Sequence, residues 1–322
     1  MKSISSVLKI SVAPMMGYTD RHARYLFRLI SPHVQLYTEM VIAKALLHGN
    51  RSKLLGFNEE EHSLVLQLGG SDPDEMAKAA VLAEEAGYDE ININIGCPSD
   101  RVQSGEFGAC LMARPVLVAE IYSAMQNAVK IPVTIKHRIG IDDQDSFADL
   151  EKFITQVSKA GCSKFIVHAR KAWLKGLSPK QNRVVPPLDY GRVYRLKVEH
   201  PKLKIIVNGG IKNTNEVYDH LAHADGVMIG REVFNQPWML SELEQLIYPG
   251  QDELFSRDEV RRRYSRYIEE ELQKGTSAHL LAKPIAGLFH GKKGARAWRR
   301  LLTETVHNRT DHLARVVAEF NP

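Results

Sequence analysis

Cys97 lies at the end of an alternating apolar run, DEININIGCP (residues 89–98), and a glycine-containing loop follows it. A free cysteine has a pKa of about 8.5, so at neutral pH most of its thiol holds a proton that it can donate. When a hydride reaches one carbon of an activated C=C bond, the other carbon needs such a proton from the opposite face. Cys97 is therefore a candidate general acid. A buried structural cysteine is the alternative, and we expect that role for Cys110 and Cys162.

Two other apolar runs end in glycines. Asn208, Gly209 and Gly210 close the run KIIVNGG, while Gly230 and Arg231 close the run DGVMIGR. Glycines leave backbone N–H groups bare, and two such turns at neighbouring strand ends can hold an anion closely. Each of these glycine-containing ends alone is explained equally well as an ordinary turn that ends a strand. Together they predict a bound phosphate group.

Three polar side chains stand in or at the ends of further apolar runs, namely Gln67, Lys136 and His168. An isoalloxazine ring needs amide contacts along its uracil-like edge, and positive charge near N1 and the C2 oxygen stabilises its reduced anion. With the predicted phosphate, these side chains favour tightly bound FMN. For Lys136 the alternatives are a Schiff-base nucleophile or an ion-pair partner, and for His168 a hydrogen-bonded core histidine.

A repeated pattern of strands and helices must position these residues. Helical patterns, such as those of residues 72–87, 114–129 and 146–161, lie between most of the short apolar runs. Eight strand–helix units in series predict an α/β fold, the (β/α)8 TIM barrel, with its active site at the carboxyl ends of the strands. Pro14, Met15 and Met16 follow the first strand there. The expected strands are residues 10–14, 34–39, 64–69, 91–96, 132–138, 164–170, 204–210 and 225–231.

The strand pattern stops near residue 245, and helical patterns follow at 256–274 and 294–306. We therefore expect an FMN-binding TIM-barrel catalytic domain at residues 1–247 and a small α-helical domain at residues 248–322. Three sparse cysteines without zinc-site spacing indicate neither a disulfide framework nor a metal site. No apolar stretch reaches the roughly 18 residues of a membrane span, and no signal peptide is visible. We expect a cytoplasmic monomer without a membrane or metal partner.

The positive charge is concentrated in two stretches. The chain has a formal net charge of +5, and residues 168–183 and 283–300 contain five and six basic residues and no acidic ones. Such stretches favour a polyanionic partner. Solvated surface faces are the alternative for either stretch alone.

Long motifs in residues 10–247 match one known family in sequence and order: APMMGYTD, LVLQLGG, NIGCPSDRVQSGEFGACLM, VTIKHRIG, VHARKAWLKGLSPKQNR and VNGGI. Through them the chain resembles the flavin-dependent tRNA dihydrouridine synthases, and the stretch HARKAWLKGLSPKQNRVVPPLDY resembles their bacterial A subfamily. The resemblance implies NADPH-dependent reduction of the C5–C6 bond of uridines 20 and 20a in the tRNA D loop. It also implies that hydride passes from reduced FMN to C6 and that Cys97 protonates C5.

The resemblance also implies that the helical domain at residues 248–322 binds tRNA, and it assigns roles to single residues. It places the target base near Asn94 and the tRNA backbone near Arg183 and Arg299, while Arg296 is added only because of its helical spacing to Arg299. The flavin contacts of the family fall on Pro14, Met15, Met16, Gln67, Lys136, His168, Asn208, Gly209, Gly210, Gly230 and Arg231.

Three other functions are consistent with parts of this pattern. A small-molecule flavin reductase of the dihydroorotate or dihydropyrimidine type would explain the site and not the basic tail. An RNA-binding protein whose barrel has lost catalysis would explain the tail and not the presence of Cys97, Lys136 and His168. A Schiff-base lyase would use Lys136 alone.

Overall fold

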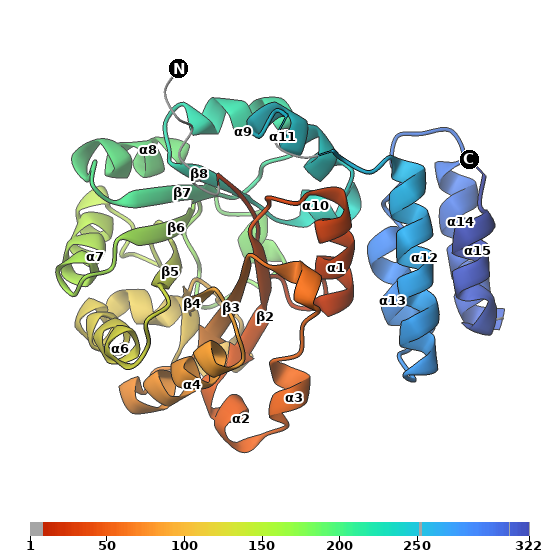
Figure 1. Ribbon diagram of the computed structural model, residues 1–322. Helices are drawn as coiled ribbons and strands as arrows, with labels where there is room; N and C mark the ends of the chain where they lie inside the picture. Colours follow the sequence, from red (N-terminus) through yellow and green to blue (C-terminus); the bar gives the residue numbers. More distant parts are fainter. Residues whose placement is uncertain (1–8, 251–252, 309, 322) are drawn as a thin grey trace.

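The computed structural model describes residues 9–250, 253–308 and 310–321 (Figure 1). Eight parallel strands form one sheet in the order β1-β8-β7-β6-β5-β4-β3-β2. The sheet is closed on itself because the Val12 N–H donates to Gln35 O (3.0 Å) and the Gln35 N–H donates to Ile10 O (3.0 Å). The predicted (β/α)8 barrel is thereby confirmed. Its strands are β1 (Ile10–Val12), β2 (Leu36–Ile42), β3 (Leu64–Gly69), β4 (Glu90–Ile95), β5 (Val133–Arg138), β6 (Lys164–His168), β7 (Lys204–Asn208) and β8 (Gly226–Ile229).

Helices surround the strands, as Figure 1 shows, and several begin where the sequence predicts a cap. Asp72 accepts from the Glu75 N–H at the start of α4, and Ser146 forms a capping box with Asp149 at the start of α7. The barrel helices are α1 (Arg21–Ile30), α2 (Ala43–His48), α3 (Arg51–Leu54), α4 (Pro73–Glu85), α5 (Asp100–Gln103), α6 (Pro115–Ala128), α7 (Phe147–Lys159), α8 (Tyr190–Glu199), α9 (Thr214–Leu221), α10 (Arg231–Asn235) and α11 (Met239–Ile247).

The second strand differs from its prediction. We expect residues 34–39, and the structure shows Leu36–Ile42 with a shift in register against β3 between Tyr37 and Met40. Such an irregularity lengthens a strand beyond the simple alternation of apolar and polar residues. Glu39, the last residue of the expected strand, consequently lies inside β2.

The inside of the barrel is filled at mid-height by an apolar cluster of Ala13, Tyr37, Val65, Ile166, Ile206 and Met228. Side chains alternate between the two faces of a strand, so the residue two positions further along each strand points toward the same interior. Those positions include Gln67, His168, Asn208 and Gly230. The apolar cluster therefore forms the layer beneath a group of polar residues at the carboxyl ends.

A separate helical bundle follows the barrel and lies at one side of it (Figure 1). It docks on α1, where the Tyr25 and Tyr267 rings stack at 4.0 Å and the Tyr267 hydroxyl lies 2.8 Å from His22 Nδ1. The expected boundary at 247/248 coincides with the end of α11; the division into two functional domains stays a prediction. The bundle consists of α12 (Arg257–Gln273), α13 (Ala278–Ile285), α14 (Ala295–Asn308) and α15 (Leu313–Glu319).

Candidate active site

Cys97 is a free, half-buried thiol on a loop whose backbone is pinned. The N–H groups of Gly96 and Cys97 both donate to Asn94 Oδ1 at 3.0 Å, and the Ala109 N–H donates to Cys97 O at 2.9 Å. Gly108 has a φ of +77°, and a Cβ there would lie 2.5 Å from Cys97 O, so only glycine fits this close return of the chain. The geometry fixes where the thiol is presented at the barrel mouth.

The other two cysteines have no such setting. Cys162 is fully buried, and burial raises the pKa of its thiol to about 12. Cys110 is half-buried, and burial also raises its pKa. Both thiols are held in the protonated form and are unsuited to forming a thiolate.

Lys136 lies beside Asn94 in the β4–β5 register, on the interior face of β5. Burial, and then the positive charge of Arg138, lower its pKa from 10.5 to about 7, while Cys97 acts in the opposite direction. No carboxylate in the described part of the chain forms an ion pair with Lys136. The structure therefore gives no support to the ion-pair alternative, and it leaves this cation free for a ligand.

His168 lies at the end of β6, which is separated from β4, the strand before Cys97, by β5 alone. Burial lowers its pKa well below 6.5, and the nearby cations Arg138 and Lys136 lower it further. The imidazole is consequently neutral at pH 7 and can donate a hydrogen bond from one ring nitrogen while accepting at the other.

The glycines after β7 have a steric reason for their identity. Gly209 and Gly210 have φ values of +116° and +74°; a Cβ on Gly209 would lie 2.6 Å from the His168 ring, and one on Gly210 would lie 2.4 Å from Leu188. The Tyr190 hydroxyl donates to Gly209 O at 2.6 Å. Chain geometry alone thus requires these glycines, and the Asn208 side chain is likewise engaged, with Met228 O at 2.8 Å. A phosphate role for this turn stays a prediction.

Two arginines approach one another at the same end of the barrel. Arg183 has a lowered pKa because of burial first and the charge of Arg231 second, and its Nε is buried without a hydrogen-bond partner among the described residues. Arg231 follows Gly230, the residue before the short α10. A buried guanidinium donor without an acceptor costs about 1–3 kcal/mol, and a bound anion would satisfy it. This observation fits a phosphate more directly than the glycines do.

The loop after β1 supplies the remaining predicted contacts. Pro14 and Met15 are part-buried, with Met15 packed against the apolar cluster of the interior, while the Met16 side chain is 62% exposed. The Met15 carbonyl accepts from the Tyr18 and Thr19 N–H groups at 2.9 and 3.0 Å. The structure brings Met15 to the barrel mouth and points Met16 toward solvent.

The predicted tRNA-binding residues are divided between two places. Asn94 and Arg183 lie at the barrel mouth, whereas Arg296 and Arg299 lie exposed on α14, which packs on α13 and α15 and not on the barrel. Arg300, their neighbour, pairs with Glu304 at 3.7 Å. Lys283, at the start of the basic stretch 283–300, instead donates to the Gly17 carbonyl oxygen, so the basic residues of the stretch are divided between the barrel and α14.

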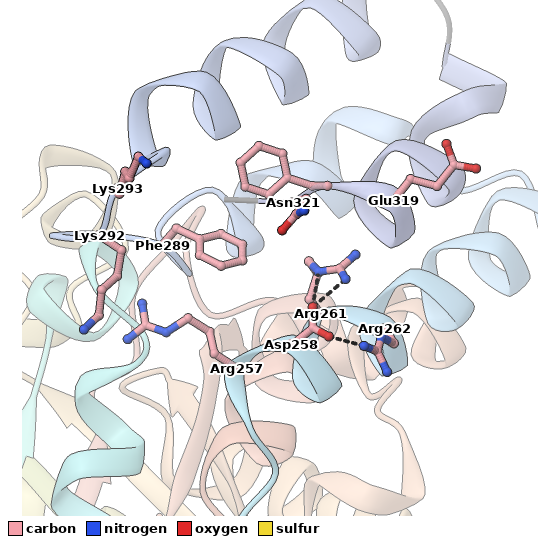
Figure 2. Close-up of a pocket in the computed structure, with 10 residues that line it drawn as sticks. Arg257, Asp258, Arg261, Arg262, Phe289, Lys292, Lys293, Glu319 and Asn321 are labelled. Carbon is pink, nitrogen blue, oxygen red and sulfur yellow. Dashed lines mark hydrogen bonds and ion pairs between the residues drawn. The ribbon is translucent and has the colours of Figure 1, made fainter.

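A hollow of about 650 Å³ lies in the helical bundle between α12, α15 and the loop before α14. Figure 2 shows Arg257, Lys292 and Lys293 on one side of it. Arg257 donates to Leu288 O at 2.6 Å and lies 4.6 Å from the Trp238 ring centroid, while Lys292 and Lys293 have no ion-pair partner in the described residues. None of the predicted site residues lines this hollow.

Sequence reasoning selected Asn94 but missed the buried polar residues Glu90 and Asn92, which precede it on the same strand. Glu90, Asn92 and Asn94 alternate with isoleucines in EININI, so three polar side chains of one strand face the barrel interior. That period of two is visible in the sequence and could have identified them. Arg138 was also missed as an organiser of the mouth, where its Nε donates to Gly96 O at 2.9 Å.

The described ranges contain neither a metal-binding cluster nor a membrane-spanning helix. No cluster of three or more His, Cys, Asp or Glu side chains there could hold a metal ion. None of the helices formed by those residues has the length and apolar character needed to cross a bilayer.

Comparison with known proteins gives a consistent result along the whole chain. The family model described as dihydrouridine synthase (Dus) matches residues 11–320. A tRNA-dihydrouridine(20/20a) synthase of Shewanella oneidensis is 54% identical over 297 residues, which cover 92% of this chain and 88% of that protein. Proteins of the same name from Synechocystis and Escherichia coli K12 are each 52% identical and cover 94% and 97% of this chain, and 90% and 92% of their own lengths. The chain belongs to the dihydrouridine synthase family.

Proposed function

We propose that this protein is a tRNA-dihydrouridine(20/20a) synthase, which reduces the C5–C6 double bond of uridines 20 and 20a in the tRNA D loop. The family match and the relatives of that name support the activity. The single structural observation that supports it best is the free Cys97 thiol on its pinned loop, beside a lysine that lacks a carboxylate partner.

The residues present fit FMN. The orphaned Nε of Arg183 and the charge of Arg231 suit its phosphate, and Asn208, Gly209, Gly210 and Gly230 surround the same end of the barrel. Pro14, Met15, Gln67, Lys136 and His168 would hold the ring, and Met16, whose side chain points toward solvent, would contribute through its backbone. When bound and reduced by NADPH, FMN supplies the hydride that goes to C6 of the uracil.

This chain's own residues supply the proton and the charge. The Cys97 thiol donates its proton to C5, so one hydride and one proton are added across the double bond and a thiolate remains. Lys136, when protonated, stabilises negative charge on the thiolate or along the ring edge. Solvent then returns the proton to Cys97.

The substrate base must leave its stack before it can reach Cys97, because a nucleobase inside folded tRNA is not accessible to a barrel mouth. Turning it out costs a few kcal/mol, and contacts with the phosphate backbone offset that cost. Arg183 at the mouth and Arg296 and Arg299 on α14 are the arginines that we assign to these contacts, with Asn94 next to the base.

The activity is tested with purified protein, FMN, NADPH and tRNA that lacks dihydrouridine. We expect dihydrouridine at positions 20 and 20a, mapped in the product, and no turnover of free uridine or uracil. Turnover of the free base without turnover of tRNA would instead identify a small-molecule reductase. A protein that binds tRNA and cannot be reconstituted with FMN would contradict any flavin activity.

A further inference from the structure

Five polar side chains form one continuous line of hydrogen bonds up the inside of the barrel, which we name the amide ladder. It begins at the floor with a carboxylate and ends beneath the Cys97 loop. From the floor upward, the donor–acceptor distances are 2.7 Å from Thr134 Oγ1 to Glu90 Oε1, 3.0 Å from Asn92 Nδ2 to Thr134 Oγ1, 2.8 Å from Gln67 Nε2 to Asn92 Oδ1, and 2.8 Å from Asn94 Nδ2 to Gln67 Oε1.

The direction of the ladder is determined at its upper end. The backbone N–H groups of Gly96 and Cys97 can only donate, so the group that they both contact must be Asn94 Oδ1. The Asn94 amide nitrogen therefore faces Gln67 and meets its oxygen. Because Gln67 Oε1 accepts from Asn94, Gln67 Nε2 must donate to Asn92 Oδ1. Asn92 Nδ2 is then left to donate to Thr134 Oγ1.

The lower end requires the same direction. The Glu90 carboxylate can only accept, so the Thr134 hydroxyl must donate to it, or to Ile91 O at 3.3 Å, and its lone pairs receive the Asn92 N–H. Lys164 holds the carboxylate in place, with Nζ 2.9 Å from Glu90 Oε2. Both ends thus specify one orientation for every amide between them.

Burial keeps water from replacing the three middle members of the ladder. The exposed fractions are 0% for Asn92, 1% for Gln67 and 2% for Thr134. A chain of hydrogen bonds that all run in one direction polarises its members, and a buried member without its partner costs about 1–3 kcal/mol. Reversal of one amide would leave two acceptors or two donors facing each other.

The ladder leaves Asn94 with one kind of polar group to offer. Its Oδ1 already accepts two N–H groups, so only the second N–H of its amide remains for a ligand. A uracil ring carries two carbonyl oxygens that accept such a donor. Asn94 in the reversed orientation would release the Cys97 loop and present an oxygen to those carbonyls.

We propose that Thr134 and Asn92 are positioning residues: through the amide ladder they fix Asn94 as a hydrogen-bond donor toward the substrate base and hold the Cys97 loop. This inference rests on the proposed function for the identity of the base. The hold on the loop is independent of that identity.

The test uses Thr134→Val, which keeps the shape of the side chain and removes the hydroxyl, and Thr134→Ser, which restores it. Hydrogen–deuterium exchange of the 94–97 segment is measured in the full-length protein without tRNA. We expect exchange at Gly96 and Cys97 to be about tenfold faster in Thr134→Val and to return to the wild-type rate in Thr134→Ser. Unchanged exchange in Thr134→Val, or no rescue by serine, would overturn the proposal.

Tyr37→Phe is the matched control at the barrel floor. It removes a buried hydroxyl 3.4 Å from Glu90 Oε1 that is not part of the ladder. We expect wild-type exchange in the 94–97 segment for this variant. If it accelerates exchange as Thr134→Val does, loosening of the floor and not the ladder is responsible, and the proposal fails.

Kinetics with tRNA provide the second readout. For Thr134→Val we expect kcat to fall about tenfold while KM for tRNA changes less than about twofold, since the phosphate contacts lie elsewhere. A rise in KM at unchanged kcat would contradict the positioning role. Absence of tRNA turnover by the wild-type protein would refute the proposed function instead, and the exchange measurement would still decide whether the ladder holds the loop.

Discussion

Arg138 donates a hydrogen bond from its Nε to the carbonyl oxygen of Gly96, 2.9 Å away, and so joins the end of β5 to the loop that presents Cys97. Its Nη1 donates to the carbonyls of Lys171 and Asn182, both at 3.0 Å. One buried guanidinium thus connects the Cys97 loop with the basic stretch 168–183 on the rim. Burial lowers its pKa to about 10, which leaves it charged at neutral pH.

Arg138→Lys should loosen both loops. A lysine amine is a single point donor and does not reproduce the fork that spans three carbonyls. We expect the free energy of unfolding to fall by about 1–3 kcal/mol, because buried carbonyls lose their donor, and kcat for tRNA to fall with it. Chemical denaturation and steady-state kinetics measure the two effects. Arg262→Lys, at an exposed ion-paired arginine, is the control and should behave as the wild type; equal stability of Arg138→Lys and the wild type would show that Arg138 does not hold these loops.

Cys97→Ala should abolish the supply of the proton to C5. We expect dihydrouridine formation to slow by a factor on the order of 10² to 10⁴, the usual contribution of a positioned acid, with FMN content near that of the wild type. Product mapping and the absorbance of bound flavin give the two readouts. Cys110→Ala removes a thiol whose Sγ lies 3.2 Å from Phe107 O on the same loop, and it should retain activity. Wild-type turnover by Cys97→Ala would refute the role of the thiol.

The barrel could be predicted from the sequence because each strand and helix has a local pattern. Helix α4 has its cap at Asp72 and a proline at its first position, and α7 has its capping box at Ser146. These signals depend on neighbours within four residues, so one sequence is sufficient. The end of β2 is different: it depends on a register shift against β3, a contact between residues 27 to 28 positions apart that no local pattern records.

Site residues could be predicted where their type and their position relative to a strand are sufficient to select them. They could not be predicted where their role depends on a contact with another strand. Cys97, Lys136 and His168 stand at strand ends and could be selected in that way. The contact between Asn94 and Gln67, and that between Arg138 and Gly96, join neighbouring strands and form only when those strands pair. For the same reason, the basic stretch 283–300 reads as one patch in sequence, whereas Lys283 reaches the Gly17 carbonyl on the barrel and Arg299 lies on α14.

Lys136 should make the stability of the ligand-free protein depend on pH. Its pKa is lowered to about 7 in the folded protein, whereas that of an unburied lysine is 10.5. Between these values the unfolded chain binds more protons, so stability rises with pH, by about 1.4 kcal/mol per pH unit at most. Below about pH 7 both states are protonated and the full cost of burying the charge is present. We expect Lys136→Met to be more stable than the wild type at pH 6 and to lose that advantage progressively by pH 9 to 10.

Urea unfolding at pH 6, 7.5 and 9 measures the free energy of unfolding of the wild type and of Lys136→Met. Subtracting one value from the other at each pH removes the contribution of the other titrating groups. Lys164→Met is not a suitable control, because Lys164 pairs with Glu90. Lys175→Met, at an exposed lysine of the rim loop, should show no difference that varies with pH. A difference between wild type and Lys136→Met that stays constant from pH 6 to 9 would show that Lys136 retains its ordinary pKa.

Arg299→Glu should weaken tRNA binding and leave the reduction of bound flavin by NADPH intact. Arg299 is exposed on α14 and has no ion-pair partner among the described residues, so its charge is available to phosphate. Reversal of one phosphate contact reduces the dependence of log Kd on log salt by about one unit. Binding titrations with unmodified tRNA at several salt concentrations measure that slope, and stopped-flow absorbance measures flavin reduction.

Arg315→Glu changes the net charge equally at an arginine that pairs with Glu319 at 2.9 Å, so it controls for long-range repulsion. Arg299 does not belong to the binding surface if Arg299→Glu and the wild type bind tRNA equally at moderate salt, or if Arg315→Glu weakens binding as much. Lys292 and Lys293, which line the hollow of the bundle, would then be the next residues to vary.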